Sequence, residues 1–220
     1  MEAFIKKHQY NYINRCLHEL NSTFKNSVDK NVIETNKAYL YEKILSMFES
    51  LSDRQKELLD ITKIDDPLFI DKYIASLVEY VYGMPEVTNT QLTKLFKKEK
   101  KLKLPDKSIL DLKKVYLGWI DNSSGKLFIA YNLNGKLLGM ACRVTSFTPK
   151  SGNICTLCNH IGSESEVAFV SPLCKTSDTG EGAYRSIGFS LCLDSQSCNE
   201  RITSVEQLER ILKDVNNIDK

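Results

Sequence analysis

Two closely spaced cysteine pairs decide the fold of the C-terminal half: Cys155-Thr-Leu-Cys158 and Cys192-Leu-Asp-Ser-Gln-Ser-Cys198. A tetrahedral zinc ion needs thiolates held close together, each at about 2.3 Å from the metal. The C-x2-C pair predicts a tight knuckle that supplies two ligands, and the longer C-x5-C pair supplies the other two. The spacing therefore predicts one structural zinc ion bound by four cysteines. Four reduced thiols without a metal are the main alternative, and disulfides are a weaker one.

Two other residues compete as ligands. His160 lies two residues after Cys158, too close to complete the same tetrahedron comfortably, and Cys174 has no second ligand nearby. Replacement of one of the four cysteine ligands by either residue is therefore only a secondary alternative. Four thiolates leave no position for water, so the predicted zinc ion is structural and not catalytic.

The segments around the cysteines follow the order of a treble-clef zinc finger over residues 152–215. Gly152-Asn153 precedes the knuckle, and residues 166–170 and 184–192 have the composition of two strands. Thr203-Ser-Val-Glu206 matches a capping box and predicts a closing helix. A knuckle, a hairpin and a last cysteine pair just before a helix is the treble-clef order.

An antiparallel meander is predicted upstream, over residues 115–146. Three β-type runs cover residues 115–120, 127–131 and 136–144, and Asn134-Gly135 between the last two is a strong hairpin signal. Trp119 lies in the first run, where we expect it to anchor the sheet against a helix. That helix begins at the capping box Thr88-Asn-Thr-Gln91.

The first 83 residues are predicted to form an antiparallel helical bundle. One apolar stripe falls at helical spacing on Ile13, Cys16, Leu17, Leu20 and Phe24, and another runs from Leu40 to Leu51. A capping box at Ser52 and an Asp66-Pro67 start predict two further helices, the last of which Gly83 and Pro85 should end. Short connections between four such helices are typical of a bundle.

Together these elements predict an α+β chain with two domains. Residues 1–83 form the helical bundle, and residues 84–220 form a domain with a helix, the meander and the treble-clef finger. We expect a cytoplasmic protein that crosses no membrane, because no apolar run is long enough, the N-terminus lacks a signal core, and seven cysteines fit a reducing compartment. We also expect a monomer.

The charge is concentrated in one segment. Residues 94–107 carry seven lysines and two acidic residues, a charge of +5, which leaves −3 for the rest of the chain. This basic ridge suggests a specific acidic partner surface, although a solvated helix end would look the same. No Ser/His/Asp or Cys/His constellation, P-loop or G-x-G-x-x-G motif is present, so we expect a protein that is not an enzyme.

An ordered set of motifs resembles the FusB-type elongation factor G-binding proteins nearly end to end. The motifs are His8-Gln-Tyr-Asn-Tyr-Ile13, Gln91-Leu-Thr-Lys-Leu-Phe-Lys-Lys98, Lys100-Lys-Leu-Lys-Leu-Pro105, Tyr116-Leu-Gly-Trp119, Cys155-Thr-Leu-Cys-Asn159 and Asp194-Ser-Gln-Ser-Cys-Asn199. The resemblance implies a helical N-terminal domain, a C-terminal treble-clef zinc domain and no enzymatic activity. It further implies elongation factor G as partner, release of that factor from the ribosome and protection against fusidic acid. The four cysteines match the zinc ligands of the family.

The candidate partner-binding face combines the strand before Cys192 with the basic ridge. It consists of Tyr184, Arg185 and Phe189 together with Lys97, Lys98, Lys101 and Lys103. Resistance-type members resemble one another in a lysine-rich approach to the third cysteine, whereas Arg185 is the only charge in residues 184–191 here. A housekeeping relative is therefore one alternative. A zinc-finger protein that binds ribosomal RNA is the other, favoured by the lysines and Trp119.

Overall fold

The computed structural model describes residues 2–106, 113–145, 152–172 and 187–218. The chain divides into two compact units, Met1–Val81 and Tyr82–Lys220. The sequence placed this boundary after residue 83. Each unit has its own hydrophobic core and is described by itself.

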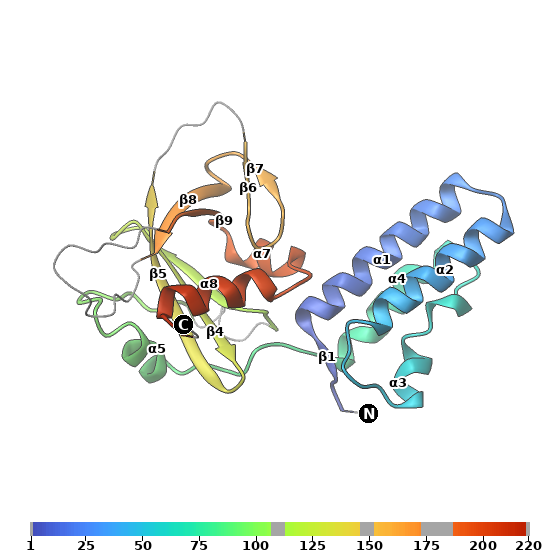
Figure 1. The fold of residues 1–220 in the computed structure, drawn as a ribbon, viewed down its shortest axis with the longest axis horizontal. Coiled ribbons are helices and arrows are strands. Elements are labelled where there is room, and N and C mark those ends of the chain that lie inside the picture. Colours follow the sequence, from blue (N-terminus) through green and yellow to red (C-terminus); the bar gives the residue numbers. More distant parts are fainter. Residues whose placement is uncertain (1, 107–112, 146–151, 173–186, 219–220) are drawn as a thin grey trace. The chain divides into compact units, whose positions relative to one another are not determined.

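The N-terminal unit consists of helices, as the apolar stripes predicted. Its elements are α1 (Lys7–Asn26), α2 (Lys30–Leu45), α3 (Asp53–Leu58), η1 (Ile61–Lys63), η2 (Pro67–Phe69), α4 (Ile70–Leu77) and η3 (Val78–Tyr80). The long helices α1 and α2 run side by side in opposite directions (Figure 1). The first stripe is buried as expected at four of its five positions, with Cys16 inside the core at 3% exposure, and Phe24 is partly buried. The capping box at Ser52 forms, with Gln55 as its second member.

The second half of this unit is less regular than the sequence suggested. The predicted third and fourth helices break into short α and 3-10 turns, because Asp60 and Asp66 cap new turns through their side chains. The last helical turn ends at Tyr80, before Gly83, and Val81–Tyr82 forms a strand, β2, that pairs with β1 (Ile5–Lys6). Helical periodicity therefore did not predict this short two-stranded sheet, which pairs a strand near the start of the N-terminal unit with a strand at its end.

Lys37 is an almost fully buried cation in this unit. Its side chain is 2% exposed, and Nζ lies 2.8 Å from Glu34 Oε1 and 3.0 Å from Asp65 Oδ1, while both carboxylates are mostly exposed. Removing a carboxylate leaves the buried ammonium underpaired, whereas removing the ammonium leaves two solvated carboxylates. We expect Asp65→Asn combined with Glu34→Gln to cost about 2–4 kcal/mol of unfolding free energy, and Lys37→Met distinctly less. Urea unfolding followed by far-UV circular dichroism measures both, and equal losses would contradict this explanation.

The C-terminal unit is built around a five-stranded antiparallel sheet. Its strands are β3 (Leu117–Asp121), β4 (Lys126–Leu133), β5 (Lys136–Thr145), β8 (Val167–Pro172) and β9 (Phe189–Cys192), in the order β3-β4-β5-β8-β9. A small hairpin of β6 (Asn153–Ile154) and β7 (Ile161–Gly162) lies beside it. The meander and the finger were predicted as successive modules, but β8 pairs with Cys142–Thr145 and makes one continuous sheet of the two.

Turn chemistry sets the register of the meander. Asn134 and Gly135 have φ values of +50° and +84°, the left-handed conformations that a type I′ turn needs. The turn joins β4 to β5 with Leu133 opposite Lys136. The hairpin predicted from Asn134-Gly135 is thus present.

The two faces of the sheet carry two separate cores. On one face Trp119 stacks on Phe128 with a centroid distance of 5.1 Å and meets Phe96 edge-on at 5.6 Å. Phe96 ends α5 (Asn89–Leu95), whose Thr88 capping box forms as predicted, and the Trp119 Nε1–H donates to the Lys103 carbonyl at 2.9 Å. Trp119 is 6% exposed, so it anchors the sheet against this helix as expected.

The opposite face packs on the closing helix and the finger. Leu138, Met140 and Cys142 of β5 share a core with α8 (Glu206–Asn216) and with residues near the cysteine pairs. Figure 1 shows α8 lying across the strands of the sheet. The predicted capping box at Thr203 is wrong: the Glu206 backbone N–H bonds to Ser204 Oγ, and α8 begins with no side-chain cap from Thr203. Among the described helices, none is long and apolar enough to cross a membrane.

Candidate metal centre

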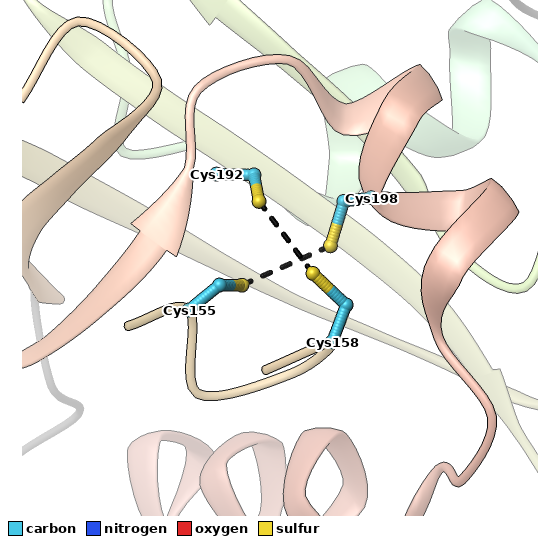
Figure 2. A group of neighbouring side chains, drawn as sticks. All are labelled: Cys155, Cys158, Cys192 and Cys198. Carbon is cyan, nitrogen blue, oxygen red and sulfur yellow. Dashed lines mark hydrogen bonds between the residues drawn. The ribbon is translucent and has the colours of Figure 1, made fainter. Parts of the chain in front are cut away.

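The four predicted ligands come from three elements that converge on one point (Figure 2). Cys155 follows β6, Cys158 closes the turn after it, Cys192 ends β9, and Cys198 lies in α7 (Ser195–Arg201). Their sulfur atoms all lie within 4.8 Å of one another. Among the described residues, no other cluster of three or more Cys, His, Asp or Glu side chains could hold a metal ion.

The sulfur positions fit a tetrahedral zinc ion. Cys155 Sγ lies 3.9 Å from Cys198 Sγ, and Cys158 Sγ lies 3.6 Å from Cys192 Sγ. Four thiolates at about 2.3 Å from a central zinc would be about 3.8 Å apart along each edge of the tetrahedron. A disulfide would bring two sulfurs to about 2.05 Å, so these cysteines are not paired with one another. The thiolate set and its spacing make this a site for one structural Zn²⁺.

Backbone hydrogen bonds hold the knuckle in shape. The Cys155 N–H donates to the His160 carbonyl at 2.8 Å, and the Asn159 N–H donates to the Cys155 carbonyl at 2.9 Å. Asn159 adopts a φ of +60°, a conformation that asparagine tolerates better than most residues. The Thr156 N–H donates to the Ser190 carbonyl at 2.8 Å, which fixes the knuckle to β9 and to Cys192.

A second layer of side chains surrounds the thiolates. Arg201 Nη2 lies 3.7 Å from Cys192 Sγ, so a guanidinium offsets part of the negative charge of a four-thiolate zinc site. Tyr116 is 1% exposed, and burial followed by the charge of Cys198 raises the pKa of its hydroxyl well above the ordinary value. Tyr116 therefore stays neutral beside the thiolates. Asp194 caps α7 by accepting from the Gln196 N–H at 2.9 Å and from the Ser197 hydroxyl.

The crowding of four thiols argues for a cation at their centre. Hydrogen bonds with Cys155 are the main cause that raises the pKa of both Cys192 and Cys198 above the ordinary thiol value, whereas hydrogen bonds with the other cysteines, Cys158 first, lower the pKa of Cys155. Four thiols this close together therefore do not all ionise without a cation between them. A divalent zinc ion reverses this preference, because it binds thiolates and displaces their protons.

The competing ligands stay outside the cluster. His160 Nε2 lies 3.9 Å from Glu166 Oε1 and is not among the clustered donors. Cys174 lies outside the described residues. Cys16 is buried in the N-terminal core, and Cys142 is buried in the core that also contains Cys155, Cys192 and Cys198, but neither is among the clustered donors.

The predicted partner-binding residues are described only in part, and their role stays a prediction. Tyr184 and Arg185 lie outside the described residues. Phe189 begins β9, is half-buried and packs against the sheet core, so only part of its ring is available to a partner. The lysines at positions 97, 98, 101 and 103 are exposed. Lys103 also lies 3.8 Å from the buried Asp121 carboxylate.

Asn199, quoted above only as the last residue of a motif, has a structural role that the sequence did not predict. It is 6% exposed; its Oδ1 accepts from the Val115 and Tyr116 N–H groups at 2.7 and 3.1 Å, and its Nδ2 donates to the Tyr116 and Ser195 carbonyls at 3.0 and 2.8 Å. One side chain thereby joins the ligand-bearing helix α7 to the chain just before β3. The sequence signal that could have pointed to Asn199 is the polar pair Ser195 and Asn199, spaced i and i+4 beside Cys198.

Comparisons with known proteins agree with this arrangement. Residues 4–85 match the family described as "Elongation factor G-binding protein, N-terminal", and residues 89–218 match "FBP C-terminal treble-clef zinc-finger". The solved "Structure of the fusidic acid resistance protein FusC" matches with a TM-score of 0.77 and 24% identity, over 97% of this chain and 98% of that one, which shows a shared fold. No curated protein matches the sequence significantly. Because the second family match alone spans more than half of the chain, this protein belongs to the FusB-type family of elongation factor G-binding proteins.

Proposed function

We propose that this protein binds elongation factor G, promotes its release from the ribosome and so protects translation from fusidic acid, without catalysing a reaction. The observation that carries the proposal is the pairing of both family domains with an intact four-cysteine site in one chain. The solved structure with the same fold is that of a fusidic acid resistance protein, which supports the same role.

Release requires a difference in affinity. A protein that bound the ribosome-held and released forms of the factor equally would shift nothing, however tightly it bound. We therefore propose that the binding face fits the factor in its released or rearranged conformation. A zinc ion holds the loops of that face in place before contact, which lowers the ordering cost of binding.

Apolar side chains beside the knuckle support a protein partner. Ile154 and Ile161 are directly opposite each other on β6 and β7 and are 56% and 67% exposed. Neighbouring exposed apolar groups of this kind are typical of protein contacts. They extend the candidate face beyond Phe189, which is partly used by the core.

The test separates binding from protection. We expect purified elongation factor G to be retained by this protein in a pull-down with excess RNA competitor, and retention to be lost in a zinc-free Cys155→Ser variant. Addition of the protein to a translation reaction inhibited by fusidic acid should restore synthesis in a dose-dependent way. Retention of RNA without the factor would overturn the proposal, and binding without restored synthesis would limit it to a housekeeping role.

A second candidate function is binding of ribosomal RNA. Lys97, Lys98 and Lys101 are exposed and lie close together in sequence, as a phosphate-binding surface would require. Trp119, the other feature that suggested nucleic acid, is stacked on Phe128 and largely buried, so it offers no platform to a base. The affinity of such RNA binding would fall with salt. For each phosphate neutralised, the association constant would drop by roughly one logarithmic unit per tenfold increase in salt concentration.

A further inference from the structure

A groove in the C-terminal unit lies apart from the cysteine site. It has a volume of about 320 Å³ and is formed by the end of α5 and the residues just after it, the middle of β5 and the last turn of α8. Figure 1 shows α5 and α8 next to β5. α5 and α8 cover opposite faces of the sheet, as their separate cores show, so the groove opens between them at the edge of β5.

The lining of the groove is partly apolar, with the half-buried Leu95 at its surface and nearly buried side chains behind it. Phe96, Met140 and Val215 line the groove and are 6%, 2% and 2% exposed. A Cβ at Gly139 would lie 2.7 Å from Leu95 Cδ2, so glycine is needed for α5 to approach β5 this closely. Asn216 Nδ2 donates to the Gly139 carbonyl at 3.1 Å and holds the end of α8 against the strand.

β5 contributes the middle of the groove. β8 pairs with β5 over Cys142–Thr145, and the groove is lined by the β5 residues just before this pairing, from Gly139 to Ala141. The Gly139 carbonyl already accepts from Asn216, so a ligand here would be held by side-chain contacts and charge and not by strand pairing.

The rim of the groove is strongly basic. Lys94, Lys97 and Lys98 line it, and all three are exposed. The one carboxylate in the lining, Glu99, is held by Lys126 at 2.6 Å, with both side chains less than 20% exposed. No ion pair among the described residues involves the three rim lysines. Their positive charge is therefore available to a ligand.

We infer that this groove binds an acidic segment of elongation factor G that inserts an apolar side chain between α5 and α8. The inference rests on the proposed function and names a contact within it. Basic groups around a partly apolar lining match a peptide in which acidic residues flank an apolar one, since charge and shape are then both complementary. A nucleic acid backbone would match the lysines but not the exposed apolar part of the lining, to which Leu95 contributes.

The experiment compares two triple variants of the full-length protein with the same change in charge. Lys94→Glu, Lys97→Glu and Lys98→Glu reverse the rim, whereas Lys56→Glu, Lys72→Glu and Lys136→Glu reverse exposed lysines that lie outside the basic ridge and do not line the groove. We expect the rim variant to raise the Kd for purified elongation factor G on the order of tenfold and the control variant to change it less than about threefold. Zinc content and circular dichroism should be unchanged in both.

A photocrosslink identifies the segment that is bound. A benzoylphenylalanine incorporated in place of Lys97 should crosslink to a stretch of the factor rich in aspartate and glutamate, as located by mass spectrometry. Equal effects of the two triple variants, or crosslinks confined to non-acidic segments, would overturn the inference while leaving the proposed function intact. Loss of RNA retention with unchanged factor binding in the rim variant would also overturn it. If the unmodified protein fails to bind the factor, the proposed function itself fails.

Discussion

Replacing Cys155 by serine is expected to reduce the zinc content from one ion per chain to none and to unfold the C-terminal unit. Zinc binding contributes about 10–16 kcal/mol in finger-sized peptides, whereas whole domains are stable by only about 5–15 kcal/mol. Loss of the ion therefore removes most or all of the margin that keeps β8, β9 and α7 in place. Cys192→Ser, or excess chelator added to the unmodified protein, should have the same effect.

The chain has a built-in reporter for this experiment. Trp119 is the only tryptophan and is buried in the C-terminal unit, so a red shift of its emission reports unfolding of that unit alone. The helical signal of residues 1–81 should persist, because they form a compact unit with its own core. Cys16→Ala is the matched control, since Cys16 is buried in that other core, and it should keep a full zinc ion. One zinc per chain in a folded Cys155→Ser variant would disprove the four-cysteine assignment.

Asn199→Leu is expected to cost about 3–5 kcal/mol of unfolding free energy in the C-terminal unit. The substitution keeps the volume roughly constant but removes four buried hydrogen bonds at once. It leaves the Val115 and Tyr116 backbone groups unpaired where water cannot reach them, at about 1–3 kcal/mol for each unsatisfied group. Because Asn199 follows Cys198 directly, zinc affinity should also fall, on the order of 10- to 100-fold.

Two comparisons make the Asn199 result specific. Asn199→Asp keeps the two acceptor contacts but loses both donors and adds a negative charge near the thiolates, so it should weaken zinc binding at least as much as leucine does. Asn132→Ala, which removes one exposed turn contact to the Gly135 N–H at 2.8 Å, should cost about 1 kcal/mol or less. Urea titration followed by Trp119 emission, with a competing chelator for zinc affinity, measures all three. Equal stability of the Asn199→Leu and Asn132→Ala variants would contradict this role.

The local elements of the fold were the most predictable part. Asn134-Gly135 predicted a hairpin correctly, because only a few residue types tolerate two consecutive left-handed conformations. Ser52 and Thr88 fixed two helix starts because their hydroxyls satisfy backbone donors that would otherwise lack partners. The four cysteines fixed the metal site because thiolate spacing around zinc is strict.

Features that depend on contacts between distant segments were not predictable. No local pattern in Cys142–Thr145 indicates that β8 will pair with it and merge the meander with the finger. The β1–β2 pair joins residues about 75 positions apart, and its two-residue strands are too short to show an alternating pattern. Asn199 was missed for the same reason: its partners, Val115 and Tyr116, lie 84 and 83 residues away.

The continuous sheet also orders events during synthesis of the protein. β3, β4 and β5 are joined by tight hairpins, which form within microseconds of the strands becoming available. Cys198, in contrast, lies 43 residues after Cys155, which at typical elongation speeds corresponds to about 2–9 s of further translation. The three strands of the meander can therefore pair before the fourth zinc ligand has been made. The complete four-cysteine site can form only after Cys198 has been added, so we expect full-length chains made without zinc to have a folded N-terminal unit but no finished finger.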